Sequence, residues 1–291
     1  TGAQKIAVIL VTFPSRAIAA NITQEFIKGV FLGNSFSSDQ QNPDRSISDF
    51  WTQNSDGKTW VNNSGTGSLT VVSVSLAQDY AYCAPDSNGN LTDNSSAVRQ
   101  AAYAAANGSI NYNDFARVVV ILPNNGSCSG WAGFGTIGCW GSECPGDGAC
   151  NFSWTWWRDD QVWNRGAGVN LGTHEMGHNL GMGHAGSRYH AGAVVGPVGV
   201  AGTRSEYGDN FGTMGFWNFG FYNASHELNT LGWLNSSSVQ TVTANGTYAV
   251  QSFDSFGASP KALKIQRGTG NTSAWLYVAY YPSGGTYLGA L

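Results

Sequence analysis

Three histidines and one glutamate lie close together in the chain, as His174, Glu175, His178 and His184. The stretch reads H-E-x-x-H-x-x-G-x-x-H. Residues four apart share one face of a helix, so His174 and His178 can present two imidazoles to one metal ion. Gly181 can adopt φ > 0, which ends the helix and lets the chain turn back with His184. Three protein ligands that leave a fourth position for water are typical of a catalytic zinc site rather than a structural one.

Glu175 occupies the position next to the first histidine, where metal-assisted hydrolysis needs a general base for water. The chain has five histidines in 291 residues, and three of them fall inside this stretch. That concentration argues against ordinary surface histidines on a structural helix. The sequence therefore predicts Zn²⁺ held by His174, His178 and His184, with Glu175 as the catalytic residue.

A methionine follows the histidines at a distance that carries further information. Met214 lies 30 residues beyond His184, within Gly212-Thr213-Met214-Gly215. The longer histidine pattern followed by a methionine turn is the pattern of the metzincin metalloproteases. In that interpretation Met214 is an apolar, polarizable support beneath the metal ligands. The alternative is an ordinary methionine of the core.

The segments around the histidines narrow the resemblance to one family. They are Cys128-Ser129-Gly130-Trp131-Ala132-Gly133, Glu206-Tyr207-Gly208-Asp209, Tyr222-Asn223-Ala224-Ser225-His226-Glu227 and Leu231-Gly232-Trp233. With the motif, they make the chain resemble the gametolysin family of secreted metalloproteases over roughly residues 5–233. The resemblance implies a zinc endopeptidase that acts on extracellular proteins, with glycoproteins among the candidate substrates. The founding algal members break down cell-wall glycoproteins, and the algal namesake carries Gln where this chain has His174, so the cell-wall substrate is not carried over.

Four residues outside the metal motif have alternative interpretations. Tyr207 can stabilise an oxyanion or simply pack, and Asp209 can brace a ligand histidine or cap the following turn. His190 and His226 are expected to be hydrogen-bonded structural residues, because the predicted site already has three ligands.

The composition excludes some classes of partner. Charged residues make up 11% of the chain, against about 25% in an ordinary domain. The formal net charge is −4 and no basic run occurs, so nucleic acid is not an expected partner. No apolar stretch is long enough to insert into a membrane. We expect a secreted monomer whose partner is a protein or glycoprotein substrate.

Five cysteines indicate disulfide bonds in an oxidising compartment. The simplest pairing joins neighbours, Cys128 with Cys139 and Cys144 with Cys150, and leaves Cys83 free. Pairing of Cys83 into the cysteine-rich loop is the alternative.

The pattern along the chain predicts an α/β fold of the metzincin type, with a mostly parallel sheet. The zinc helix is expected over residues 168–183, in an N-terminal catalytic subdomain, 1–184. A C-terminal subdomain, 185–291, is expected to hold the Met turn and a β-rich end, within one catalytic domain. Expected elements are strands at 5–13, 68–76 and 117–122, helices at 23–32, 46–52 and 95–106, a long loop at 124–157, and late strands at 240–252, 262–266 and 274–281.

A second function remains open at this point. A protein that kept the zinc fold without turnover would be a secreted module that binds glycoproteins or carbohydrates. An intact Glu175 argues against it, because loss of the general base is the expected mark of such a protein.

Overall fold

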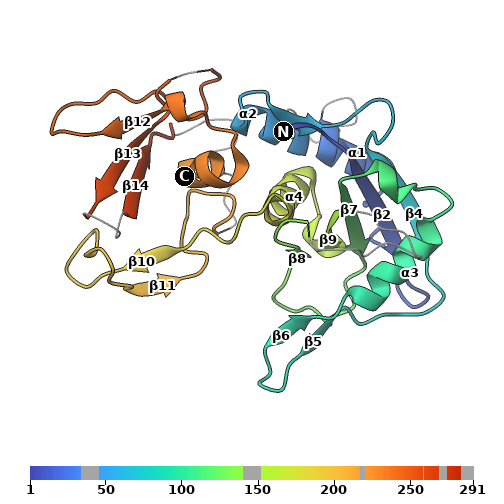
Figure 1. Cartoon of the computed structure of the whole chain (residues 1–291). Helices are drawn as coiled ribbons and strands as arrows, with labels where there is room; N and C mark the ends of the chain where they lie inside the picture. The colour runs from blue at the N-terminus through green and yellow to red at the C-terminus, as the bar shows by residue number, and fades with distance from the viewer. Residues whose placement is uncertain (34–45, 140–151, 217–219, 258, 269–273, 283–291) are drawn as a thin grey trace. The chain divides into compact units, whose positions relative to one another are not determined.

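The computed structural model describes residues 1–33, 46–139, 152–216, 220–257, 259–268 and 274–282 (Figure 1). The chain divides into two compact units. Unit 1 comprises Thr1–Asp49 and Thr59–Gly181, and unit 2 comprises Phe50–Lys58 and Met182–Leu291. The predicted subdomain boundary at residue 184 stays a prediction.

Unit 1 is built on a five-stranded sheet with the order β4-β2-β7-β9-β8. Its strands are β2 (Ile6–Thr12), β4 (Thr70–Ser75), β7 (Arg117–Leu122), β8 (Gly133–Gly135) and β9 (Ser153–Arg158). The first three and β9 pair in parallel, and β8 pairs antiparallel with β9. The predicted mostly parallel sheet is therefore confirmed.

Helices cover both faces of this sheet. They are α1 (Gln24–Leu32), α3 (Ser96–Ala106) and α4 (Arg165–Asn179). Alternate residues of β2, such as Ile9 and Val11, pack into one cluster with Val98 and Ala102 of α3. On the opposite face, Phe31 of α1 stacks on Trp157 at 5.7 Å between ring centroids. Since both faces are buried, β2 and β7 read as continuous apolar runs.

The predicted long loop at 124–157 is partly wrong, because it contains β8 and most of β9. All six residues of β9 are buried, and the strand lies between β7 and β8 in the sheet. Its sequence, Ser-Trp-Thr-Trp-Trp-Arg, lacks the aliphatic residues that mark β2 and β7. Aromatic and β-branched residues nevertheless favour a strand when both faces are covered.

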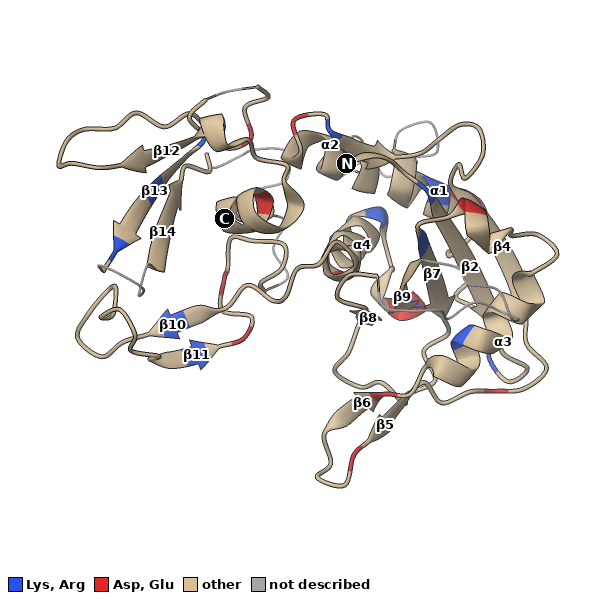
Figure 2. Ribbon diagram, viewed as in Figure 1, with Lys and Arg blue, Asp and Glu red and all other residues tan. Residues whose placement is uncertain are grey.

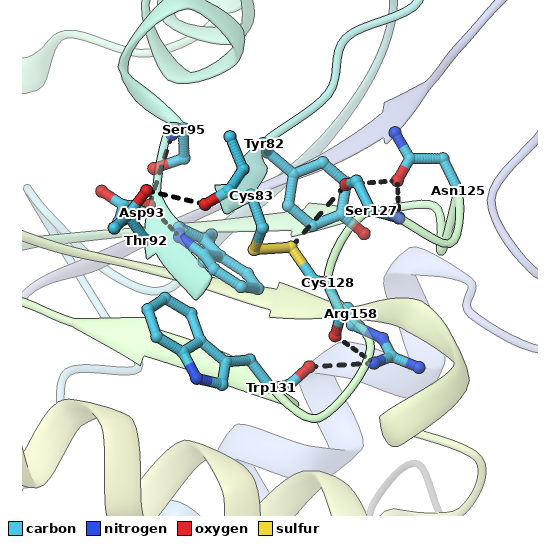
Figure 3. The surroundings of a disulfide bond; sticks show 12 residues. Tyr82, Cys83, Thr92, Asp93, Ser95, Asn125, Ser127, Cys128, Trp131 and Arg158 are labelled. Carbon is cyan, nitrogen blue, oxygen red and sulfur yellow. Dashed lines mark hydrogen bonds between the residues drawn. A yellow bond between two sulfur atoms is a disulfide. The ribbon is translucent and has the colours of Figure 1, made fainter. Parts of the chain in front are cut away.

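The predicted disulfide pairing is also corrected. Cys83 bonds to Cys128, with 5.1 Å between their Cα atoms, so the alternative pairing into the loop holds (Figure 3). Cys139 is exposed and unpaired among the described residues, while Cys144 and Cys150 lie outside them. The predicted Cys128–Cys139 pair does not form, because the segment after β7 brings Cys128 to Cys83 of the β5–β6 hairpin. The Cys144–Cys150 pair stays a prediction.

Short two-stranded sheets complete unit 1. The hairpin of β5 (Cys83–Pro85) and β6 (Leu91–Asp93) is antiparallel, and β1 (Gly2–Gln4) pairs in parallel with β3 (Thr59–Val61). Helix α2 (Ile47–Asn54) begins in unit 1 and ends in unit 2.

Unit 2 contains a three-stranded sheet and a separate hairpin. The sheet has the order β12-β13-β14, formed by Val239–Val242, Ala262–Arg267 and Ala274–Ala279. The hairpin pairs β10 (Ser187–Tyr189) with β11 (Thr203–Ser205). A short helix, α5 (Ala224–His226), continues into a π-helical turn at Glu227–Leu231. The β-rich end is therefore confirmed, although the strand expected at 240–252 ends at Val242.

Candidate metal centre

Helix α4 carries the first two histidines. It runs from Arg165 to Asn179, so it begins three residues before the predicted zinc helix and ends four residues earlier. Asn164 caps it, because its side-chain oxygen accepts a hydrogen bond from the backbone N–H of Ala167 at 2.7 Å. The imidazole rings of His174 and His178 lie 5.0 Å apart between centroids, as one helical turn requires.

A glycine turn at the end of α4 brings the third histidine to the same place. Gly181 has φ 99°, a conformation that side chains disfavour, and its N–H donates to the carbonyl of His178 at 2.8 Å. The expected role of Gly181 is therefore confirmed. The potential ligand atoms of His174, His178 and His184 all lie within 4.8 Å of one another.

The chemistry of this donor set fits zinc. Three neutral imidazoles on the H-E-x-x-H-x-x-G-x-x-H spacing suit Zn²⁺, which binds nitrogen readily in tetrahedral sites. Among the described residues, the three histidines form the one group of at least three His, Cys, Asp or Glu side chains that can hold a metal ion. His190 and His226 lie outside this group. Nδ1 of His226 is buried and has no hydrogen-bond partner among the described residues, so the expected hydrogen-bonded role is not supported for that ring nitrogen.

Glu175 is buried next to the first histidine. The residue is only 6% exposed, and burial raises the pKa of its carboxyl group to about 8. That value belongs to the metal-free chain. A cation held by the neighbouring imidazoles favours the ionised carboxylate, which is the form a general base needs.

The edge strand β8 buries this glutamate. A Cβ atom at Gly133 would lie 3.0 Å from Cγ of Glu175, and one at Gly135 would collide with the Glu175 carbonyl oxygen. The strand can approach the helix this closely because both positions are glycine. β8 therefore shields Glu175 from solvent on the side of α4 that faces this strand.

Further contacts fix α4 against the sheet. The side-chain amide of Asn179 donates to the carbonyls of Thr136 and Trp154 at 3.0 and 2.9 Å. Two turns earlier in the helix, a Cβ at Gly172 would lie 2.6 Å from Ile47 and 2.8 Å from Trp157. A glycine inside a helix costs about 1 kcal/mol relative to alanine, and here it permits close packing.

The third histidine has a partner to which the sequence interpretation gave no role. Nδ1 of His184 lies 3.0 Å from Oε1 of Glu206, and the Tyr207 ring lies 4.0 Å from the imidazole between centroids. The Tyr207 ring packs on His184, and its alternative role toward an oxyanion stays a prediction. Glu206 belongs to one of the segments that carry the family resemblance, but its position in the sequence does not point to His184.

The segment around Met214 is tied to the residue that follows His184. Met214 is buried, and its carbonyl accepts a hydrogen bond from Ala185 N–H at 2.8 Å. The carbonyl of Ala185 in turn accepts from Asp209 N–H at 3.1 Å. The Asp209 side chain accepts from the N–H of Phe211 at 2.9 Å, so it caps the turn.

One comparison with known proteins identifies a family. The family model described as Gametolysin peptidase M11 matches residues 5–273. No curated protein matches the chain.

Proposed function

We propose, since the chain belongs to the gametolysin (M11) family of metallopeptidases, that it is a secreted zinc endopeptidase that hydrolyses peptide bonds in extracellular proteins. The observation that carries the proposal is the convergence of His174, His178 and His184 beside a buried Glu175. Peptide hydrolysis needs a polarised carbonyl, an activated water and a group that moves the proton.

Each residue of the motif has a distinct task. His174, His178 and His184 hold the ion as neutral imidazoles through one ring nitrogen each. Zinc, when bound, polarises the scissile carbonyl and lowers the pKa of a coordinated water to about 7. The carboxylate of Glu175 accepts the proton of the attacking water and delivers it to the leaving amine. β8 keeps this carboxylate away from bulk water, which strengthens its interactions with the reacting groups.

Met214 is proposed as the methionine of the Met turn. Its support is burial, the Gly212–Gly215 backbone hydrogen bond of 2.8 Å that closes the turn, and the link to Ala185. In this role the side chain is an apolar base for the ligand histidines rather than a group that takes part in the reaction.

One observation supports an extracellular location. The Cys83–Cys128 disulfide is typical of oxidising compartments. Among the helices formed by the described residues, none has the length and apolarity needed to cross a bilayer. Proteins that share this compartment, glycoproteins included, are the proposed substrates.

Casein or gelatin digestion with and without a chelator tests the activity. The zinc-loaded protein is expected to cleave internal peptide bonds, and chelation is expected to stop cleavage until zinc is restored. If no protein is cleaved in a chelator-sensitive way, the chain is instead a binding module without turnover.

The variant Glu175→Gln tests the mechanism. It keeps a side chain of the same size but removes the base, so kcat/KM is expected to fall about 10²- to 10⁴-fold while zinc content stays at one ion per chain. Glu25→Gln, at an exposed carboxylate in α1, is the matched control. Full activity of Glu175→Gln would contradict the assigned role.

A further inference from the structure

The β10–β11 hairpin brings Glu206 to the third histidine across 22 residues of sequence. The strands pair antiparallel, with Ser187 opposite Ser205. Glu206 directly follows β11, and His184 precedes β10 by three residues. The pairing therefore returns the chain to the neighbourhood of His184 just where the acidic side chain occurs. Each strand of the hairpin also carries one basic residue, Arg188 in β10 and Arg204 in β11; Lys and Arg are blue in Figure 2.

Two glycines let the ends of this hairpin approach closely. A Cβ atom at Gly186 would lie 2.6 Å from the carbonyl oxygen of Ser205, and one at Gly208 would collide with the Ser187 side chain. Backbone bonds from Ala185 to Asp209 and to Met214 hold the same region. The approach of Glu206 to His184 is thus set by backbone packing, not only by a flexible surface side chain.

The contact selects one of the two imidazole nitrogens. A carboxylate only accepts hydrogen bonds, so the Nδ1 that faces Oε1 of Glu206 at 3.0 Å must carry the proton. In the neutral ring the Nε2 lone pair is then the one that remains for a metal. The Tyr207 ring, 4.0 Å from the imidazole, limits the rotation of His184.

We propose that Glu206 is a positioning residue, which fixes the tautomer and the orientation of His184 so that Nε2 binds the ion. A carboxylate behind a ligand histidine also raises the basicity of the imidazole. The proposal rests on the proposed function only in that these histidines hold zinc, and it does not require that peptides are cleaved.

A plain surface contact is the competing explanation, and Glu25 provides its control. The Glu206 side chain is 60% exposed, and the Glu25 side chain, paired with Lys28 at 2.7 Å, is 61% exposed. Exposed ion pairs contribute little to stability. If Glu206 acts only as such a pair, Glu206→Ala and Glu25→Ala will behave alike.

The first measurement is metal affinity, determined with a competing chromophoric chelator. Glu206→Ala is expected to bind Zn²⁺ about 10- to 100-fold more weakly. Glu206→Gln, whose amide oxygen can still accept from Nδ1, is expected to recover part of the loss. The d–d spectrum of the Co²⁺-loaded protein is expected to change in Glu206→Ala and to stay unchanged in Glu25→Ala.

The second measurement reads the tautomer directly. Imidazole ¹⁵N shifts of the metal-free protein at about pH 8.5, where an ordinary histidine is neutral, are expected to show His184 protonated at Nδ1. Glu206→Ala is expected to shift His184 toward the Nε2–H form.

The outcomes separate the two proposals. Zinc affinity of Glu206→Ala within about twofold of the parent, with an unchanged His184 tautomer, would overturn the role of Glu206. If zinc affinity depends on Glu206 but no protein is cleaved, the peptidase proposal is overturned and the role of Glu206 stands.

Discussion

Two buried carboxyl groups in this chain differ in what surrounds them. Glu175 lies beside three imidazoles that gather for a cation. Glu227 is 1% exposed, and its Oε1 has no hydrogen-bond partner among the described residues. Burial is the largest effect on Glu227 and raises its pKa well above the usual value. The positive charges of Lys261 and Lys58 lower the pKa, and the negative charge of Asp56 raises it. The fold thus favours the protonated form of Glu227.

At the scale of this residue, Glu227→Gln is expected to stabilise the protein at neutral pH. The pKa of Glu227 is raised in the folded state, so its carboxyl group contributes fully to stability below the unfolded pKa of about 4.3. That contribution is lost as the pH rises from there through the folded pKa, because only the unfolded chain ionises readily in this range. Glutamine does not titrate and keeps the neutral shape. Urea unfolding at pH 4 and pH 7 checks this, with a larger gain expected at pH 7. An equal effect at both pH values would show that the pKa of Glu227 is not raised in the folded protein.

Helix α4, which carries two of the metal ligands, packs against the edge strand β8 and the neighbouring strand β9 of the sheet. Gly135→Ala in β8 is expected to force the strand away from α4, because the added Cβ collides with the Glu175 carbonyl oxygen. We expect a loss of about 1–3 kcal/mol in the free energy of unfolding, and a fall in kcat/KM as Glu175 becomes solvated. Chemical unfolding and peptide hydrolysis measure the two effects.

A matched glycine controls for the substitution itself. A Cβ atom at Gly108 would have no atom of the described residues within 4 Å, so Gly108→Ala is expected to leave stability and activity close to the parent. If both variants lose stability equally, close packing of β8 on α4 is not the cause.

The elements recognised from sequence are those whose residue pattern reflects local burial. β2 and β7 are runs of aliphatic residues apart from Thr12 and Arg117, and the side chain of Thr23 caps α1 by accepting a hydrogen bond at 3.0 Å. β9 was missed because the residues before it are rich in Gly and Cys and show no periodicity, although tryptophan and threonine themselves favour a strand. Its place in the sheet depends on covering both faces, which no local pattern reveals.

The metal ligands could be predicted from the local sequence pattern, whereas the partner of His184 could not. His174 and His178 are related by one helical turn, and a glycine brings His184 to them, so the spacing sufficed to predict the group. Glu206 reaches His184 only through β10 and β11, whose residues are all exposed. Without an alternation of buried and exposed residues, the sequence carries no signal for that hairpin.

The Cys83–Cys128 disulfide joins two segments of the chain that no strand pairing among the described residues holds together. Cys83 lies in β5, and Cys128 lies in the connection from β7 toward β8, so the bond closes a loop of 45 residues (Figure 3). Arg158 holds the same connection, since its guanidinium donates to the carbonyls of Cys128 and Trp131 at 2.8 and 2.9 Å. The disulfide therefore anchors the chain just before the strand that buries Glu175.

Removal of this disulfide is expected to reduce stability much more than loss of a surface thiol. The double variant Cys83→Ser/Cys128→Ser frees a 45-residue loop in the unfolded chain, for which the chain-entropy estimate is about 4 kcal/mol. Cys139→Ser changes an exposed cysteine and is expected to alter the free energy of unfolding by less than about 0.5 kcal/mol. Urea unfolding measures both. Because Arg158 still holds residues 128 and 131, the double variant is expected to retain zinc binding under conditions where it stays folded. A double variant as stable as the parent would show that the strands and Arg158 suffice to fix the connection.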